Sequence, residues 1–270
     1  MARKEIFAMA QRSLGGETTK KTETMRIVNE HLRFPRVSLV DPAPSVYLHI
    51  AAEVDRRPPF LWNSAKKKRL IADCKRWCER LEQEPGVVSA VVFDALLIAP
   101  GRGRFIEKRL DQAHVARFDL AVLIEIEGAE VARRIETSAT YREMEQAIRD
   151  AASYTHAIAA TNVKRINAVD HARPGVFLFN YFFADRTEQN LAVWEYTAGW
   201  FQKETGLDNS TVLLPTDAQA SQYNIINHCR WDRLVDVLPS LIFKRTFRSY
   251  VLANFEANDV AAMPILYRMA

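Results

Sequence analysis

The sequence predicts an α+β fold in which two βαββαβ units follow one another in a single chain of 270 residues. Two strand-like runs, at 45–55 and 175–185, are rich in aliphatic and aromatic residues and end in an acidic residue. A helical stretch follows each run and ends at a glycine, Gly86 or Gly206, the residue favoured at a left-handed helix end. Strand-like and helical segments then recur in the same order, as expected of an internal repeat.

The remaining elements follow from local patterns: β-branched and aromatic runs for strands, and apolar residues at three- and four-residue intervals for helices. In the first unit, strands are predicted at 45–55, 87–100, 117–128 and 162–170, and helices at 65–87 and 135–151. In the second unit, strands are predicted at 175–185, 210–217, 223–232 and 262–269, and helices at 188–207 and 238–254.

These elements divide the chain into three parts. Residues 1–44 are interpreted as a partly flexible N-terminal tail whose first 24 residues are dispensable. The first unit spans 45–172 and carries a charged insertion at 101–115, and the second unit spans 173–270. An insertion with glycines at its start suits a lid over a cavity entrance.

The apolar pattern also predicts how the two units pack. A four-stranded sheet with two helices on one face leaves its other face in need of cover. The run "VFLFNYFF" is apolar on both of its faces, which a half-solvated strand would not show. We therefore expect the two sheets to pack against each other as a closed or nearly closed barrel.

Charge and composition narrow the class of protein. The net charge is +4, but residues 175–270 hold eight Lys or Arg against ten Asp or Glu, so the basic excess lies entirely in the first part of the chain. Its basic stretches are not interleaved with aromatic residues, so we expect no nucleic-acid partner. No apolar run of 18 residues occurs, and three cysteines suit a reducing compartment. These features predict a cytoplasmic protein without a membrane partner.

The sequence lacks the motifs of several kinds of enzyme chemistry. The sequence has no serine-hydrolase elbow, phosphate-binding loop, zinc-protease motif or glycine-rich dinucleotide fingerprint. Cys74 and Cys78 lie four residues apart on a predicted helix without further ligands at metal spacing, so we interpret them as core thiols and expect no metal site.

Residues 175–270 resemble the dimeric α/β-barrel superfamily, and within it the antibiotic-biosynthesis monooxygenase group. The resemblance rests on a third strand that runs into "RWD", on a helix that contains "LPSLIFK", and on a short last strand. Residues 45–170 resemble the superfamily by fold pattern alone. The resemblance implies tandem ferredoxin-like units forming a pseudo-dimer in one chain, either monomeric or further assembled as a homodimer. It leaves function open, because one fold hosts many activities.

Two residues of the second unit resemble pocket residues of the family and so indicate a candidate site. Trp231 ends the third strand of the second unit and resembles a pocket tryptophan of the family, although in most relatives it packs beneath the second helix. Asn180 lies between phenylalanines, where its amide must find a partner. It resembles a strand asparagine of haem-degrading oxygenases, but a bond to a nearby loop or to Asn227 is an equal alternative.

Strand alternation divides the polar residues at 224–231 into two groups. Asn227, Cys229 and Trp231 share one face, whereas His228 and Arg230 share the other. The sequence leaves open which group lines a cavity, and a bulge near Arg230 would bring both groups together.

His228 is a candidate base near neutral pH or a haem ligand. In the haem-degrading relatives the proximal histidine lies on the second helix, and the segment 232–254 contains none. A haem ligand would therefore have to be His228, His49 or a tyrosine.

Three hypotheses follow. The first is a cofactor-independent, monooxygenase-like enzyme for an aromatic or polyketide-like substrate bound in the barrel. Asn180, Asn227 and Arg230 would orient the substrate and stabilise its oxyanion, Trp231 would wall the pocket, and His228 would take the proton. Tyr181 and Phe179 complete the substrate-binding set.

The second hypothesis is haem binding or degradation, with haem as the cofactor. The third is a non-catalytic ligand-binding or structural barrel filled by the aromatic residues of the strand at 175–185. These residues are Phe177, Phe179, Tyr181 and Phe183. In the first and third hypotheses the expected partner is a small hydrophobic or aromatic ligand, without a cofactor.

Overall fold

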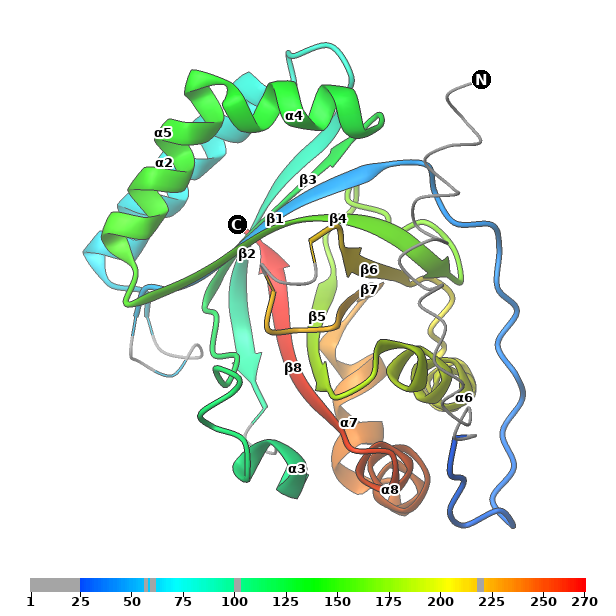
Figure 1. Cartoon of the computed structure of the whole chain (residues 1–270). Coiled ribbons are helices and arrows are strands. Elements are labelled where there is room, and N and C mark those ends of the chain that lie inside the picture. Colours follow the sequence, from blue (N-terminus) through cyan, green and yellow to red (C-terminus); the bar gives the residue numbers. More distant parts are fainter. Residues whose placement is uncertain (1–24, 56–57, 59–61, 100–102, 218–220) are drawn as a thin grey trace.

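In the computed structural model, which describes residues 25–55, 58, 62–99, 103–217 and 221–270, antiparallel strands close into one barrel (Figure 1). The first unit contributes β1 (Val46–Glu53), β2 (Val87–Ile98), β3 (Leu120–Ile126) and β4 (Tyr154–Arg165). The second unit contributes β5 (Val176–Ala184), β6 (Thr211–Pro215), β7 (Ile225–Trp231) and β8 (Val260–Met269). The order around the barrel is β1-β3-β2-β8-β5-β7-β6-β4, so β2–β8 and β4–β6 pairs join the units. The predicted pair of βαββαβ units with joined sheets is confirmed.

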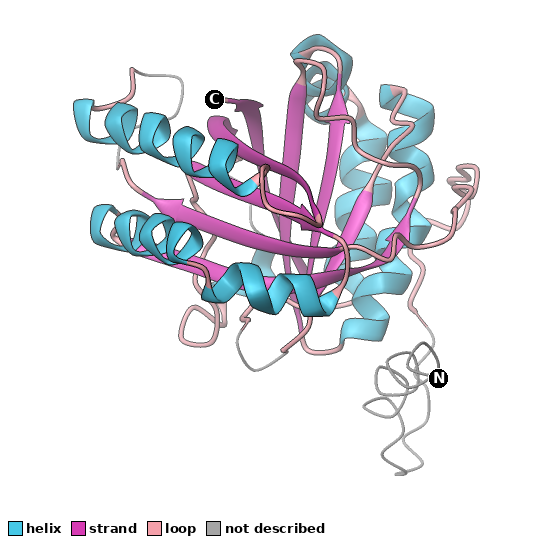
Figure 2. Ribbon diagram, turned by 90° about the horizontal axis from the view of Figure 1, so that it is seen from above, coloured by secondary structure: helices cyan, strands magenta, loops and turns pink. Residues whose placement is uncertain are grey.

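The helices cover the outside of the barrel. Those of the first unit are α2 (Ala65–Leu81), α4 (Ala129–Thr137) and α5 (Ala139–Ala151), and the segment between β2 and β3 holds α3 (Gly103–Glu107). Those of the second unit are α6 (Thr187–Thr205), α7 (Leu234–Phe243), a π-helix (Phe247–Leu252) and α8 (Ala253–Ala257). Figure 2 shows the strands enclosed between these two groups of helices. Each unit therefore has a helix-covered outer face and a face turned into the barrel.

Four predicted elements differ from the structure. The helix predicted at 65–87 ends at Leu81, before Gly86, and the helix predicted at 135–151 is divided by the extended backbone of Ser138, which separates α4 from α5. The sequence pattern predicts the last strand of the first unit at 162–170, but β4 begins at Tyr154 and ends at Arg165, and residues 166–175 form a loop. The small and threonine-rich stretch at 155–161 takes strand form because it pairs with β1 along its length. The helix predicted at 238–254 is divided, because Lys244 adopts an extended conformation that ends α7.

Aromatic side chains fill the barrel interior. Phe177, Phe179, Tyr181 and Phe183 all point inward from β5 and are buried, as the filled-barrel hypothesis expected. Phe93 on β2 packs edge-on against Phe177 and Phe179, at ring-centroid distances of 5.2 and 5.1 Å. The interior is therefore a packed core, as small barrels commonly have.

The insertion plugs one end of the barrel. Of the predicted segment 101–115, residues 101 and 102 lie outside the described residues. Phe105 of the insertion packs on Phe183 at a centroid distance of 5.7 Å, and Phe118, which follows the insertion, packs on Tyr181 at 4.8 Å. The loop 166–175 lies over the opposite end, where β1 and β5 begin, and brings His171 against Phe93 and Phe177.

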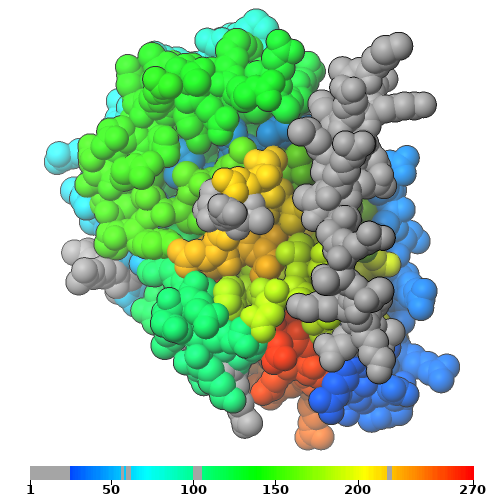
Figure 3. Space-filling view, in the orientation of Figure 1, coloured from blue at the N-terminus to red at the C-terminus, as the bar shows by residue number. Residues whose placement is uncertain are grey.

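Residues 25–39, which we call the strap, run along the second unit. Figure 1 shows the strap as the blue trace beside α6, and Figure 3 shows it along the outer edge of the molecule. The side chain of Asn258 bonds both the N–H and the carbonyl of Arg26, and that of Asn254 bonds those of Val28. These paired bonds hold the strap by its backbone, and residues 1–24 lie outside the described part of the chain.

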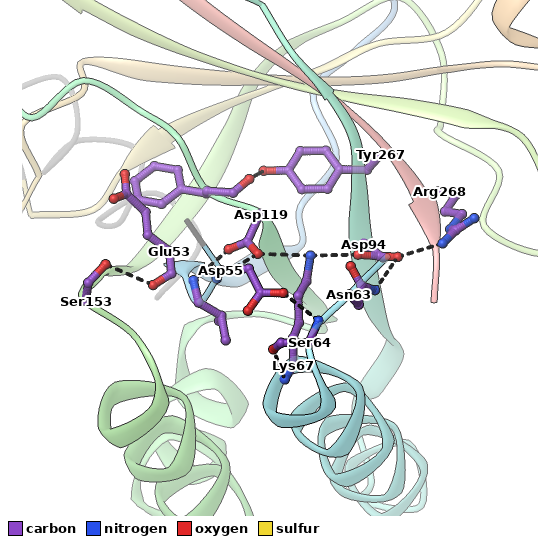
Figure 4. Close-up of polar contacts among 12 residues, drawn as sticks. Glu53, Asp55, Asn63, Ser64, Lys67, Asp94, Asp119, Ser153, Tyr267 and Arg268 are labelled. Carbon is purple, nitrogen blue, oxygen red and sulfur yellow. Dashed lines mark hydrogen bonds and ion pairs between the residues drawn. The ribbon is translucent and has the colours of Figure 1, made fainter. Parts of the chain in front are cut away.

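A buried charge cluster joins α2 to the sheet of the first unit (Figure 4). The Nζ of Lys67, which is 1% exposed, lies 2.8 Å from Asp94 Oδ1 and 3.0 Å from Asp119 Oδ2. Asp94 also accepts from Arg268 on β8, and Asp119 accepts from the backbone N–H groups of residues 54 and 55. The cluster thus links α2, β2, β3 and the last strand of the second unit.

Candidate functional site

A small cavity lies between α6 and the outer face of the second unit's sheet. Its volume is about 30 Å³, which is room for about two water molecules. Six of its lining residues matter for its chemistry: Asn180, Asn227, Trp231, Trp194, Phe201 and Ser210. Three of these, Asn180, Asn227 and Trp231, are site residues predicted from the sequence.

The polar side of the cavity is formed by two asparagines that differ in whether the side-chain oxygen is hydrogen-bonded. Asn180 and Asn227 are directly opposite each other on β5 and β7. The Oδ1 of Asn180 is buried and has no hydrogen-bond partner among the described residues. Asn227 Oδ1 accepts from Ser210 Oγ at 2.5 Å, while its Nδ2 makes only a weak contact with Cys229 Sγ at 4.0 Å. The cavity therefore offers a free acceptor beside a weakly used donor, which is the complement of a hydroxyl group.

The apolar side is aromatic and held in place. Trp231 Nε1 donates to Thr205 Oγ1 on α6 at 3.0 Å, which fixes the indole between sheet and helix. Trp194 and Phe201 approach from α6. Burial raises the pKa of the Cys229 thiol far above its usual range, so this lining residue stays protonated and inert. An aromatic wall with a few polar groups is the usual form of a small-ligand site.

The structure also decides which strand face carries each predicted residue. Asn180, Asn227 and Trp231 face α6, whereas His228 and Arg230 lie on the opposite face of the sheet, together with Phe179 and Tyr181. The predicted set is thus divided into two groups by the sheet itself. His228 cannot take a proton from a ligand at Asn180, because the backbone of the sheet lies between them.

Inside the barrel, both ring nitrogens of His228 have polar partners. Its Nδ1 lies 3.0 Å from the carbonyl oxygen of Leu178, and its Nε2 lies 2.8 Å from Nε2 of His171. Its ring stacks on Phe179 at 4.1 Å between centroids. Burial, with the neighbouring His171, lowers the pKa of His228 well below its ordinary value, so the imidazole is neutral at pH 7.

Arg230 is engaged as well. Its guanidinium donates to the carbonyl of Pro174 at 2.5 Å and pairs with Asp232 at 2.8 Å. Gly175 lies so close that a Cβ there would be 2.7 Å from Arg230 Nε. The arginine therefore anchors the loop 166–175 to β7 and does not reach Asn180.

The histidines of the barrel do not fit haem. His49 contacts the carbonyl of Val122 through Nδ1 and the Tyr181 hydroxyl through Nε2, both at 3.0 Å. Both ring nitrogens of His228 are also engaged. A haem iron would need a cavity beside its ligand that is large enough for the macrocycle, but these rings lie in a packed aromatic core. His49 and His228 therefore do not form a haem site.

Three functional residues were missed from the sequence. Trp194 and Ser210 line the cavity, and His171 pairs with His228. Trp194 belongs to the helix predicted at 188–207, but the sequence did not single it out among the apolar residues of that helix. His171 follows a segment predicted as a strand, and no local pattern signals that it turns back into the barrel.

No protein-family model and no curated protein sequence matches the chain. Solved structures do match, at low identity. An anthrone oxidase-like protein has a TM-score of 0.60 and 9% identity over 84% of this chain and 91% of its own. A protein of Fusobacterium nucleatum, provisionally described as a monooxygenase, has a TM-score of 0.50 and 8% identity over 84% and 92%. At this identity the similarity establishes the fold.

Two further findings concern ions and membranes. Within the described ranges, no group of three or more His, Cys, Asp or Glu side chains is arranged to hold a metal ion. In the same part of the chain, no helix combines the length and the hydropathy needed to cross a bilayer.

Proposed function

Because the chain has the fold of the dimeric α/β-barrel superfamily with both units in one polypeptide, we propose that it is a small-molecule enzyme of the monooxygenase-like type. Its substrate is a hydroxylated or enolisable aromatic compound that binds beneath α6. The observation that carries this proposal is the unpartnered Oδ1 of Asn180 at the wall of an aromatic cavity. A buried acceptor without a partner costs about 1–3 kcal/mol, and a ligand hydroxyl removes that cost.

The two asparagines would have different roles. The Oδ1 of Asn180 would accept from the substrate's hydroxyl, and Nδ2 of Asn227 would donate to the oxygen once it carries negative charge. The named lining residues include no carboxylate or imidazole, so the substrate must be acidic enough to lose its proton to water. An anthrone-type compound meets this condition through its enol.

The reaction then needs no cofactor. An electron-rich enolate passes electrons to dioxygen directly, and for anthrone the balance is anthrone plus dioxygen giving anthraquinone plus water. One oxygen atom becomes the new carbonyl and the other leaves as water with the two methylene hydrogens. The protein's part is to bind the aromatic ring and orient its oxygen.

Binding requires the cavity to enlarge. A benzene-sized cavity measures about 150 Å³, several times the present volume of about 30 Å³. Phe201 is half-buried at the α6 side of the cavity, so its displacement is the smallest change that adds space.

The test is ligand binding followed by turnover. Anthrone and 1-naphthol should quench the fluorescence of Trp194 and Trp231, and naphthalene, which lacks the hydroxyl, should bind at least tenfold more weakly. Oxygen uptake with anthrone should be measurable and should fall at least tenfold in Asn180→Leu. Phe179→Leu, on the opposite face of the same strand, is the matched control and should retain binding. Equal binding of naphthol by Asn180→Leu and by the native protein would refute the assignment of this cavity.

A second function is favoured by the absence of a base among these lining residues and by the packed barrel. In this alternative the Asn180 cavity binds the same class of ligand without converting it. Saturable, Asn180-dependent binding without oxygen uptake would support the non-catalytic function over the enzyme.

A further inference from the structure

A second cavity, separate from the Asn180 cavity, lies inside the barrel beneath the loop 166–175. Its volume is about 40 Å³, and its lining includes His171, His228, Tyr47, Glu125 and Thr211. It opens on the inner face of the sheet, so it shares none of the groups assigned to the proposed function.

Two imidazole nitrogens converge beside this cavity. The Nε2 atoms of His171 and His228 are 2.8 Å apart. The Nδ1 of His228 is 3.0 Å from the carbonyl oxygen of Leu178, which can only accept, so Nδ1 carries the proton. The neutral ring then has its lone pair on Nε2. Metal-binding histidines usually donate the ring N–H that does not face the metal to a carboxylate or a backbone carbonyl. The Nδ1 of His228 makes such a bond, so its Nε2 is oriented as in those histidines.

The distance between the two nitrogens is close to that required by one shared ion. Two imidazoles on a tetrahedral zinc ion, each about 2.0–2.1 Å from it, have nitrogens about 3.3–3.4 Å apart. The observed separation is thus shorter by about 0.5 Å, judged from the same bond lengths. His228 is fixed on β7, whereas His171 lies in a loop and is only half-buried, so a small movement of His171 supplies the difference.

The cavity can provide the remaining ligands. It has room for about three water molecules. Beside two histidines, two waters complete a four-coordinate ion and three complete a five-coordinate one. Glu125 lines the same cavity, where Ser45 Oγ and Tyr47 Oη donate to its Oε1 at 2.7 and 3.1 Å. One cation, Arg165, also lines the cavity, with its Nε donating to the carbonyl of Asp41, and it opposes an incoming ion. Glu125 on the same lining offsets its charge, and the nearby Arg230 is paired with Asp232.

We propose that His171 and His228 bind a divalent transition-metal ion of the zinc class through their Nε2 atoms, with water completing its coordination. His171 binds after its ring proton moves from Nε2 to Nδ1.

The test uses the full chain without a histidine tag. Titration with Zn²⁺ at pH 7.5, followed by calorimetry, should give one ion per chain. Co²⁺ should give the visible absorption of a four- or five-coordinate nitrogen–oxygen site, and Zn²⁺ should displace it. His171→Asn and His228→Asn should each abolish both signals.

The matched control is His156→Asn, because His156 is also buried, neutral and inside the barrel but does not line this cavity. This variant should bind the ion as the native protein does. His171→Asn is the decisive variant, since its half-buried loop position leaves the fold intact, which circular dichroism checks. Absence of stoichiometric binding to the native protein, or unchanged binding to His171→Asn, would overturn the proposal.

Discussion

Asn180 and Asn227 face each other across β5 and β7, yet only one of them has its oxygen satisfied. The Oδ1 of Asn227 accepts from Ser210, while the Oδ1 of Asn180 has no partner among the described residues. The two side chains share the cavity beneath α6, so the free acceptor points to where a ligand would lie. Binding sites often retain such local costs in stability.

Asn180→Leu should therefore stabilise the ligand-free protein while removing ligand binding. Replacing the unpaired amide by an apolar side chain of similar size should raise the free energy of unfolding by about 1–2 kcal/mol. Urea denaturation measures this change. Asn162→Leu is the control, because Asn162 is buried with its amide fully bonded, to Ala43 N–H and to the carbonyls of residues 164 and 212. That substitution should instead destabilise by about 1–3 kcal/mol. Loss of stability in Asn180→Leu would indicate a partner for its amide.

Stability should fall steeply in mild acid. Burial lowers the pKa of His49 to about 3 and those of His156 and His171 to about 4, whereas unfolded histidine titrates near 6.5. Between about pH 6.5 and 4 the unfolded chain therefore binds more protons than the folded one, and each histidine removes up to about 1.4 kcal/mol per pH unit as pH falls. Above pH 6.5 this contribution is complete and constant.

Urea midpoints at pH 7.5, 6.0 and 5.0 check this expectation. His156→Phe should reduce the slope between pH 6 and 5, because one buried proton acceptor is gone. A pH-independent midpoint over this range would contradict the burial of neutral histidines.

Removing the buried lysine should be among the most destabilising single substitutions. Lys67→Met leaves Asp94 and Asp119 buried without their shared cation, at a cost of about 3–5 kcal/mol. Burial raises the pKa of Asp119, whereas at Asp94 the burial effect is outweighed by Lys67 and Arg268 and the pKa is lowered. In acid, Asp119 should therefore be protonated before Asp94, and the loss of its charge should restore part of the stability of Lys67→Met.

Two controls accompany Lys67→Met. Adding Asp94→Asn and Asp119→Asn should recover part of the lost stability, because the uncompensated charges are removed. Arg76→Met, at an exposed position of the same helix, should change stability by no more than about 0.5 kcal/mol. Equal effects at positions 67 and 76 would show that the buried cluster contributes nothing.

Gly199→Ala should detach the strap from α6. A Cβ at this position would overlap the carbonyl oxygen of Pro35, so the two segments cannot stay in contact. The substitution raises helix propensity by about 1 kcal/mol, so α6 itself should persist. Amide hydrogen exchange of the strap should accelerate at least tenfold. Gly206→Ala, where nothing lies within 4 Å, should leave strap exchange unchanged despite its strained φ of 69°.

The fold could be predicted from the sequence because local residue patterns indicate the repeated strands and helices. Strand runs at 45–55 and 175–185 and the helix that ends at Gly206 depend on neighbouring residues alone. The end predicted at Gly86 was wrong, because α2 ends at Leu81. The apolar character of both faces of β5 also indicated that the sheets cover each other. The last strand of the first unit was misplaced because its stretch at 155–161 has small and polar residues, and its strand form comes from pairing with β1.

The candidate site could be predicted from the sequence only in part. The sequence by itself placed Asn180, Asn227 and Trp231 on strands and separated Asn227 and Trp231 from His228 and Arg230, because side chains alternate along a strand. Which face meets the helix and which meets the barrel was decided only by the tertiary structure, since both faces are buried and both are rich in apolar residues. The approach of His171 to His228 likewise depends on a loop that closes across the barrel end, and no local pattern encodes a contact between residues 57 positions apart.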